Sequence, residues 1–255
     1  MTISVVIIAK DEAAVIARCL ESVTWADERV VLDSGSSDGT VALARLHGAT
    51  VSSTTDWPGF GPQKNVALAM ATCDWVLSLD ADEWVTPELR AQIEQAIVSP
   101  QGHAAYRMPR LSSYCGRTMR HSGWWPDHVT RLFRRGRAQF SSDLVHERLL
   151  VDGTTGMLSA PLRHEAIRDL EEALQKMNAY SSAGAAMRAA RGEKSSLASA
   201  VAHGLWTFIR TYVLRAGFLD GREGFMLAVS NAEGAYYRYV KLMLLADAAR
   251  ASKRG

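Results

Sequence analysis

The chain has 255 residues, of which 47% are hydrophobic and 22% are charged, and its formal net charge is +2 at pH 7. This composition excludes a disordered chain, and the weak positive balance does not indicate nucleic-acid binding. The 3 cysteines lie far apart without the spacing of a zinc site or a disulfide framework, so we expect reduced thiols in the cytoplasm. The N-terminus lacks the features of a signal peptide and no apolar run reaches about 18 residues, so we expect neither secretion nor a membrane-spanning helix.

Strand and helix patterns alternate over roughly the first hundred residues. The strand-like runs are ISVVIIA (3–9), ERVVLD (28–33), ATVSS (49–53) and DWVLSLD (74–80). The helical runs between them are DEAAVIARCLESV (11–23), GTVALARLHG (39–48) and GPQKNVALAMA (61–71). This order predicts an α/β fold with a mostly parallel, twisted sheet, right-handed crossovers and helices on both faces.

The pattern changes twice after the alternating region. Residues 103–165 mix aromatic, arginine and histidine residues with short strand-like pieces, which indicates added strands and long loops. From about residue 168 the pattern is helical almost to the end. We therefore expect an α/β catalytic domain over 1–165 and a helical C-terminal region over 166–255.

Polar residues follow three of the predicted strands. AKDE ends the first strand, DSGSSDGT the second and DADE the fourth. Each segment alone could serve only as a helix cap or turn, with Asp38 as a cap, but parallel sheets bind ligands at the carboxyl ends of their strands. The carboxylates of Asp80, Asp82 and Glu83 repel one another, so we expect a positive group among them. Because no glycine-rich phosphate-binding loop follows the first strand, a metal ion is the expected phosphate ligand.

Three separated segments resemble the donor half of family 2 glycosyltransferases, which have the GT-A fold and use nucleotide sugars. They are VVIIAKDEAAVIARCLESV, VVLDSGSSDGT and PQKNVALAMATCDWVLSLDADE. The later segments WWPDHVTRLFRR, VHERL, LRHEAIRDLEEALQKMNAYS and YVLRAGFLDGREGF resemble the branch that glucosylates the lipopolysaccharide core.

The resemblance implies a GT-A (Rossmann-like) domain and an inverting, metal-dependent hexosyltransferase. The implied reaction moves glucose from UDP-glucose to a lipopolysaccharide inner-core or other lipid-linked saccharide, at the cytoplasmic face of the bacterial inner membrane. A nucleotidyltransferase, a transferase acting on another surface polysaccharide or glycolipid, and a non-catalytic binding module remain as alternatives. The residues alone select neither the donor sugar, the acceptor nor the linkage.

The same resemblance implies roles for individual residues. Asp80 and Asp82 resemble the D-x-D motif that holds Mg²⁺ or Mn²⁺, with Asp82 the firmer ligand and Asp80 directed to the ribose side. His164 falls at the position of a C-terminal metal-ligating histidine. The residues implied in nucleotide-sugar binding are Lys10, Asp11, Glu12, Asp33, Lys64, Asp80 and Arg131, whereas Asn65 is expected to be structural.

Transfer also requires a base that deprotonates the acceptor hydroxyl. Glu147 in VHERL falls where related enzymes carry an x-E-D acid, although this sequence departs from that motif and continues with Arg148. Asp127 in WWPDHVTR is the rival base. The residues 124–126 before it could form an aromatic wall for a sugar or simply plug the core.

The C-terminal stretch 203–228 is apolar and aromatic, and Arg210, Arg215 and Arg222 interrupt it. This is the composition of a helix in a membrane interface, but also of a core helix or dimer contact. The aromatic residues that we expect on a lipid-facing side are Trp206, Phe208, Phe218 and Phe225.

Overall fold

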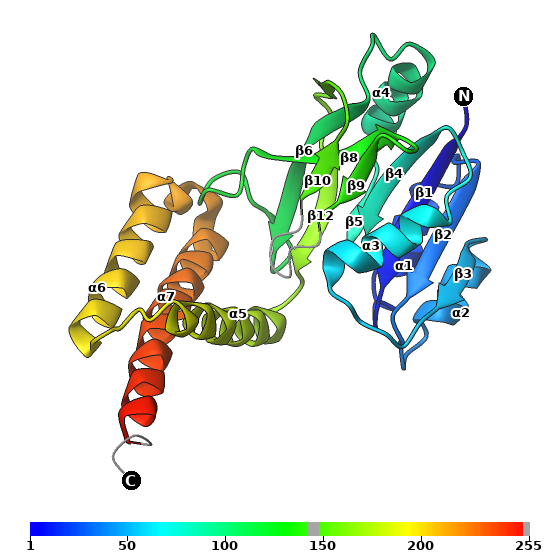
Figure 1. The fold of residues 1–255 in the computed structure, drawn as a ribbon. Helices are drawn as coiled ribbons and strands as arrows, with labels where there is room; N and C mark the ends of the chain where they lie inside the picture. The colour runs from blue at the N-terminus through cyan, green and yellow to red at the C-terminus, as the bar shows by residue number, and fades with distance from the viewer. Residues whose placement is uncertain (142–147, 252–255) are drawn as a thin grey trace. The chain divides into compact units, whose positions relative to one another are not determined.

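The computed structural model of the protein describes residues 1–141 and 148–251 (Figure 1). The chain forms two compact units. The first unit comprises 1–111 and 127–164, and the second comprises 112–126 and the chain from 165 onward. The second unit thus takes in 112–126, whereas the sequence suggested one boundary after residue 165.

The alternating strands and helices of the first unit are confirmed. Its strands are β1 (Ile3–Ala9), β2 (Glu28–Asp33), β3 (Thr50–Ser53) and β4 (Trp75–Asp80). Its helices are α1 (Ile16–Glu21), α2 (Thr40–Leu46), α3 (Phe60–Ala69) and α4 (Pro87–Val98). The four strands pair in parallel in the order β3-β2-β1-β4, so their carboxyl ends lie at one edge of the sheet.

The remaining strands make the sheet mixed rather than mostly parallel. Beyond β4 the order continues β8-β6-β12-β5, and both the β4–β8 and the β8–β6 pairs are antiparallel. These strands are β8 (Asp127–Arg134), β6 (Ala105–Tyr114), β12 (Leu162–Ile167) and β5 (Glu83–Trp84). The short strands β7 (Arg117–Thr118) and β11 (Thr155–Met157) pair with β6, while β9 (Ala138–Phe140) and β10 (Leu149–Val151) form a separate pair. This mixed sheet flanked by helices is the GT-A arrangement.

Helix α1 begins later than the predicted start at residue 11. Asp11 has a φ of 55°, outside helical geometry. The amides of residues 11–13 donate instead to the side chains of Ser36, Thr40 and Asp38, over 2.9, 2.7 and 3.1 Å. The loop after β1 is therefore joined to the loop after β2, and only the following residues can form the helix.

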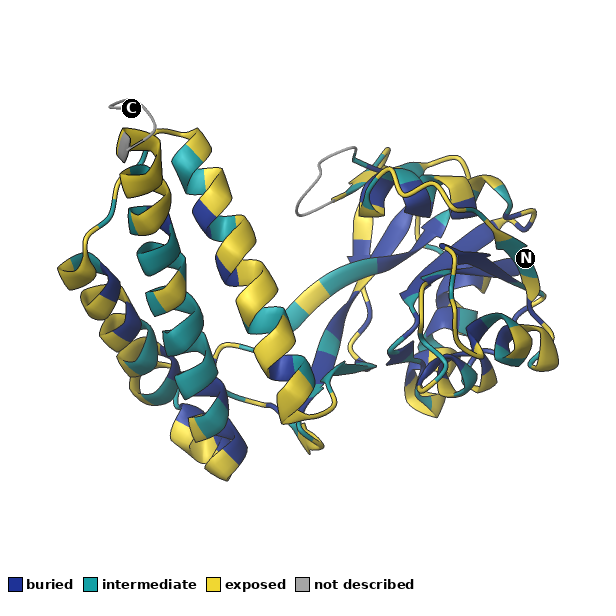
Figure 2. Ribbon diagram, turned by 90° about the horizontal axis from the view of Figure 1, so that it is seen from below, coloured by how far each residue is buried: buried dark blue, intermediate teal, exposed yellow. Residues whose placement is uncertain are grey.

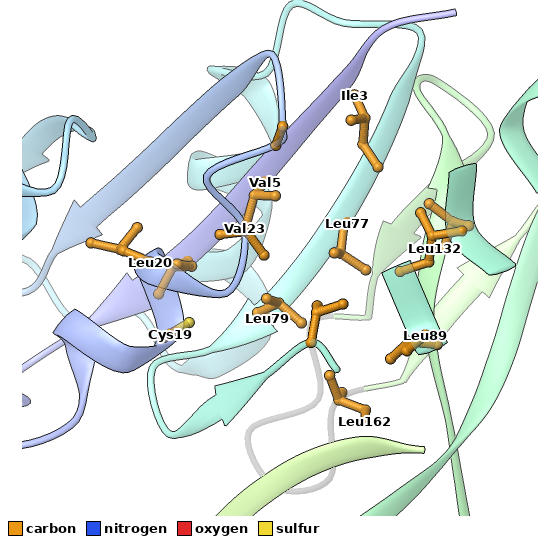
Figure 3. Packing of buried hydrophobic residues seen from close by; sticks show 14 of the residues in the cluster. Ile3, Val5, Cys19, Leu20, Val23, Leu77, Leu79, Leu89, Leu132 and Leu162 are labelled. Atoms are coloured by element: carbon orange, nitrogen blue, oxygen red, sulfur yellow. The ribbon is translucent and has the colours of Figure 1, made fainter. Parts of the chain in front are cut away.

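The core of the first unit lies on both faces of the central strands, and Figure 3 shows part of the cluster on one face. Val5, Ile7 and Leu77 belong to the buried cluster on one face, whereas Val6 and Val76 belong to the cluster on the other. Side chains alternate along a strand, so a strand covered on both faces needs the near-continuous apolar sequence seen here. The central strands thereby become a rigid support for the polar residues at their ends.

The second unit is helical, as predicted from residue 168 onward. It contains α5 (Leu170–Ala190), α6 (Leu197–Phe208), a π-helical turn (Ile209–Leu214), a 3₁₀ turn (Gly217–Asp220) and α7 (Gly221–Ala251). Side chains cap two of the helices: Asp169 accepts from the amide of Glu172 and Ser196 from that of Ser199. Helix α7 packs against both α5 and α6. Within the described part of the chain, every helix is either too short or too polar to cross a membrane.

Trp124 packs in the core of the second unit. Its ring meets the ring of Tyr114 edge to face, with centroids 6.0 Å apart, beside the buried Met119 and Leu227. Of the two roles that the sequence left open for residues 124–126, the structure therefore shows core packing for Trp124.

Candidate active site

The ends of β2, β1 and β4 form one polar edge in the first unit. The amide of Ser34, just after β2, donates to the carbonyl of Ala9 at the end of β1 over 2.8 Å. Gln63 on α3 donates from its side chain to the hydroxyl of Ser34 over 2.9 Å. Strand ends and α3 are thus tied together, as the ligand-binding edge of a parallel sheet requires.

The residues expected around the nucleoside lie on two adjoining loops. Lys10 and Asp11 are exposed, and a carboxylate oxygen of Asp11 accepts from the amide of Ser37 over 2.7 Å. Asp33 is only 2% exposed, and it accepts from the amides of Gly35 and Ser36 in its own loop. Its position is therefore set by this turn.

Asp38 and Asn65 both have structural roles nearby. Asp38 is not the N-cap of α2, which is Gly39, but it accepts from the amide of Thr40 over 2.9 Å just before that helix, next to the half-buried Glu12. Asn65 exchanges two hydrogen bonds of 2.8 Å with the backbone of Phe140, which joins α3 to β9. Asp38 and Asn65 consequently have clear structural functions.

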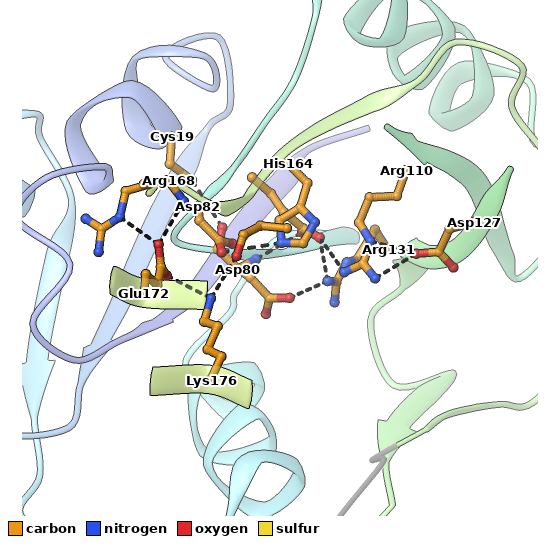
Figure 4. Close-up of polar contacts among 12 residues, drawn as sticks. Cys19, Asp80, Asp82, Arg110, Asp127, Arg131, His164, Arg168, Glu172 and Lys176 are labelled. Atoms are coloured by element: carbon orange, nitrogen blue, oxygen red, sulfur yellow. Dashed lines mark hydrogen bonds and ion pairs between the residues drawn. The ribbon is translucent and has the colours of Figure 1, made fainter. Parts of the chain in front are cut away.

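Asp80, the last residue of β4, is paired with two cations of the protein, of which Figure 4 labels Arg131. One carboxylate oxygen lies 2.9 Å from Nζ of Lys64, and the other accepts from Nη2 of Arg131. Burial alone would raise the pKa of Asp80, but the charges of Arg131 and Lys64 outweigh it and hold this pKa well below its usual range. The positive group expected beside Asp80 is therefore present as side chains.

Glu83 connects the surrounding charges. Its side chain is fully buried, and Oε1 accepts from Arg131 over 2.7 Å and lies 3.4 Å from Nη1 of Arg110. The second oxygen accepts from the amide of Asp80 over 3.1 Å. Burial would lower the pKa of Arg131, but Asp80 and Glu83 raise it above its usual value. Arg131, which was predicted to bind the nucleotide sugar, thus contacts carboxylates, and its side chain is only 8% exposed.

Asp82 has a different partner from Asp80. It lies in the turn between β4 and β5, and its Oδ2 is 3.4 Å from Nε2 of His164 on β12. His164 is held there because it pairs in register with Glu83 on β5. The structure therefore brings together two predicted metal ligands, Asp82 and His164, while both oxygens of Asp80 contact cations. The described residues contain no group of three or more metal-ligating side chains.

Asp127 is held by Arg110. The two residues are register partners on β8 and β6, and Nε and Nη2 of Arg110 lie 2.9 and 2.7 Å from the same oxygen of Asp127. Asp127 remains 43% exposed. The other candidate base, Glu147, lies outside the described residues.

Sequence reasoning assigned no role to Glu83 or Arg110. Glu83 was visible as the last acid of DADE, but nothing local distinguishes a buried acid from an exposed one. Arg110 is 17 residues from Asp127, so their pairing becomes visible only when the register of β6 and β8 is known. Cys19 borders the same site, with Sγ 3.7 Å from the carbonyl of Asp80, and burial followed by the charges of Glu83, Asp82 and Asp80 raises its pKa.

The family model described as glycosyl transferase family 2 matches residues 4–162, which include Asp80, Asp82 and Glu83, whereas His164 lies two residues beyond the match. The chain belongs to glycosyl transferase family 2.

Curated relatives of this glycosyltransferase cover nearly its whole length. An uncharacterized glycosyltransferase of Rickettsia prowazekii, RP128, is 31% identical over 94% of this chain and 86% of its own. The lipopolysaccharide core biosynthesis glycosyltransferase LpsC of Rhizobium meliloti is 27% identical over 95% of this chain and 92% of its own. The likeness therefore extends through the helical second unit.

Solved structures resemble the glycosyltransferase over a smaller part. TarS of Staphylococcus aureus (residues 1–349) is 16% identical, with a TM-score of 0.47 over 69% of this chain and 63% of that one. Glucosyl-3-phosphoglycerate synthase of Mycobacterium tuberculosis, solved with Mn²⁺, UDP and glucosyl-3-phosphoglycerate, is 30% identical. Its TM-score is 0.37 over 45% of this chain and 44% of that one.

Proposed function

We propose that this family 2 glycosyltransferase transfers glucose from UDP-glucose, with inversion, to a lipid-linked saccharide, and that Mg²⁺ or Mn²⁺ binds the donor diphosphate. The observation that carries the proposal is that the two aspartates at the end of β4 contact different groups. The charge of Asp80 is balanced by Lys64 and Arg131, whereas Asp82 lies against His164. Two carboxylates that lie two residues apart thus have different partners, and we infer separate roles for them.

The pair of Asp82 and His164 fits a divalent cation. Adjacent ligands of an octahedral ion at about 2.1 Å are roughly 3 Å apart, close to the 3.4 Å between Oδ2 of Asp82 and Nε2 of His164. Both side chains are partly accessible, at 26% and 14%. Magnesium in nucleotide sites commonly takes one or two protein ligands and completes its shell with phosphate oxygens and water.

The protein's own residues would divide the remaining work. A bound cation would stabilise the charge that grows on the departing diphosphate. Lys64 supplies positive charge at the same edge, 2.9 Å from Asp80. Lys10, Asp11, Glu12 and Asp33, on the loops after β1 and β2, would hold the nucleoside. Arg131 acts in this proposal by fixing Asp80 and Glu83 rather than by reaching the phosphates.

We assign the base that deprotonates the acceptor to Glu147. The support is the position of Glu147 in the segment VHERL, which resembles the branch of the family that glucosylates the lipopolysaccharide core. Asp127 is the alternative, since its accessible carboxylate is fixed by Arg110 on one oxygen. Either carboxylate would take the proton from the attacking hydroxyl as its oxygen bonds to the anomeric carbon and the diphosphate leaves.

The acceptor is proposed from the relatives. LpsC is named for lipopolysaccharide core biosynthesis, and its likeness covers 95% of this chain. An inner-core saccharide on a lipid anchor would place the reaction at the cytoplasmic face of the inner membrane.

Calorimetric titration with UDP, in Mn²⁺ and in EDTA, tests the donor and metal together. The wild-type protein should bind UDP at least tenfold more tightly with Mn²⁺, and Asp82→Asn should lose this difference. Asp152→Asn is the matched control, since Asp152 is 75% exposed in an ion pair with Arg137. Equal binding of UDP by wild-type protein in both buffers would refute the metal assignment.

Product analysis separates transfer from nucleotidyl transfer. With UDP-glucose and a saccharide acceptor, a glycosyltransferase releases UDP. A nucleotidyltransferase would instead release pyrophosphate from UTP and a sugar phosphate. Release of pyrophosphate without UDP would reject the proposed reaction.

A further inference from the structure

Helix α6 and the π-helical turn after it carry a strip of exposed, large apolar side chains. The strip, called here the apolar stripe, consists of residues four apart: Leu197, Val201, Leu205, Ile209 and Val213. Successive residues spaced by four are neighbours on the surface of a helix, so each side chain of the stripe adjoins the next. Leu205 is 63% exposed, and Trp206, Leu214 and Phe218 beside the stripe are more than half exposed.

The buried positions of α6 are occupied by small residues. Ala200 and Gly204 are buried, and a Cβ on Gly204 would lie 3.3 Å from the carbonyl oxygen of Ala232 and from Cβ of Tyr236 on α7. A surface helix of a water-soluble domain normally turns its large apolar residues inward. Here the small residues Ala200 and Gly204 are buried and the large residue Leu205 is exposed. Figure 2 shows in yellow that exposed residues are frequent along the C-terminal helices.

The stripe is accompanied by positive charge only. Over 197–225, all of which the structure describes, the acidic residues are Asp220 and Glu223, and both are buried. Asp220 accepts from the amides of Arg120 and His121 over 3.1 and 3.0 Å. The exposed charged residues of the segment are therefore its arginines Arg210, Arg215 and Arg222, of which Arg222 is ion-paired with Glu223.

The aromatic residues differ in part from the face expected from sequence. Trp206, Phe218 and Phe225 are exposed, at 53%, 51% and 48%. Phe208 is half-buried and contacts the rings of Tyr212 and Phe225, with centroid distances of 5.5 and 5.7 Å. The apolar stripe, rather than Phe208, defines the surface available to a partner.

We propose that the apolar stripe and its arginines dock onto the surface of an anionic lipid bilayer. Apolar side chains enter the boundary between headgroups and acyl chains while arginines attract anionic headgroups, the combination found in interfacial helices. A second copy fits less well, because a two-fold contact joins the same patch on both copies and would bring their arginines together. The inference stands on the second unit alone and does not require the proposed transfer reaction.

Vesicle co-sedimentation of the full-length protein tests this surface. The vesicles are neutral phosphatidylcholine or a 1:1 mixture of phosphatidylcholine and anionic phosphatidylglycerol. Wild-type protein should sediment with the anionic vesicles, and the triple variant Leu205→Gln, Ile209→Gln and Val213→Gln should bind at least 100-fold more weakly, equivalent to about 2.8 kcal/mol. Arg210→Gln should weaken binding to anionic vesicles by about fivefold, and binding to neutral vesicles not at all.

A matched triple variant controls for general loss of apolar surface. It replaces Leu46, Val98 and Leu150, exposed residues of the first unit, by Gln and should bind vesicles like wild type. The proposal is overturned if wild-type protein stays in the supernatant with both vesicles, or if the two triple variants lose binding equally. A wild-type dimer that the stripe variant converts to a monomer, without vesicle binding, would identify a second copy instead. Hydrolysis of UDP-glucose in lipid-free buffer reports the proposed enzyme activity separately.

Discussion

The most unusual feature of the first unit is a buried cluster of charges, and that of the second unit is an exposed apolar stripe. The first unit buries charge: Glu83 is fully enclosed and is balanced by Arg131 and Arg110. The second unit exposes apolar side chains, with Leu205 facing outward and Gly204 facing α7. A buried charge lowers stability unless an opposite charge accompanies it. A large exposed apolar patch usually marks a surface that contacts a partner or a membrane. Unusual features of this kind concentrate where proteins function.

The largest expected effect concerns the metal pair of the first unit. Asp82→Asn should reduce the rate of transfer by about 10³-fold or more, because the stabilisation of a leaving group by a metal is worth several kcal/mol. Steady-state release of UDP measures the effect. Asp152→Asn, which changes a carboxylate of the same unit outside the site, should keep the wild-type rate. Normal turnover by Asp82→Asn would remove Asp82 from the mechanism.

The next effect distinguishes the two candidate bases. Glu147→Gln should lower kcat by about 10² to 10⁴ while UDP affinity changes little, since a general base acts on the acceptor and not on the donor. Asp127→Asn should retain most of its activity if Glu147 is the base. The reverse result for the two variants would exchange their roles.

Stability should respond strongly when the buried charges lose their balance. Glu83→Gln leaves Arg131 and Arg110 with one fewer anion, so the free energy of unfolding should fall by about 3 kcal/mol. Urea denaturation measures this loss. The matched control is Glu94→Gln, whose partner Arg90 is four residues away on the exposed face of α4, and a loss of only about 0.5 kcal/mol is expected. Equal losses in both variants would show that Glu83 contributes no more than a surface pair.

The smallest effect is expected on the apolar stripe. Leu205→Gln should change the free energy of unfolding by no more than about 0.5 kcal/mol, because the side chain is largely exposed in the folded protein. Leu227→Gln, at a position of α7 that is only 2% exposed, should lower it by about 2 kcal/mol or more. A large loss for Leu205→Gln would mean that this side chain already packs within the protein, and the contrast between the two units would then fail.

Local patterns were sufficient for much of the architecture. The run ISVVIIA appears as β1 with the same bounds, because a strand covered on both faces is almost continuously apolar, and ERVVLD appears as β2 with its apolar centre buried. The acids at the end of β4 could also be located, since strand ends and their edge follow from the alternation of elements. Helix α1 was overestimated because its first residues bond to another loop, a contact that helix propensity does not report.

The residues of this chain determine by themselves its family, its alternating elements and the acids at the end of the fourth strand, because these depend on local sequence and strand order. Tertiary structure alone decides which acid is buried and which cation it contacts. The register of β6 and β8 pairs Arg110 with Asp127, and the chain geometry at the end of β4 gives Asp80 and Asp82 different partners. It also decides the direction of the apolar stripe. A spacing of four predicts a helix face equally well whether that face is buried or exposed, and only the packing of Gly204 on α7 turns the large residues outward.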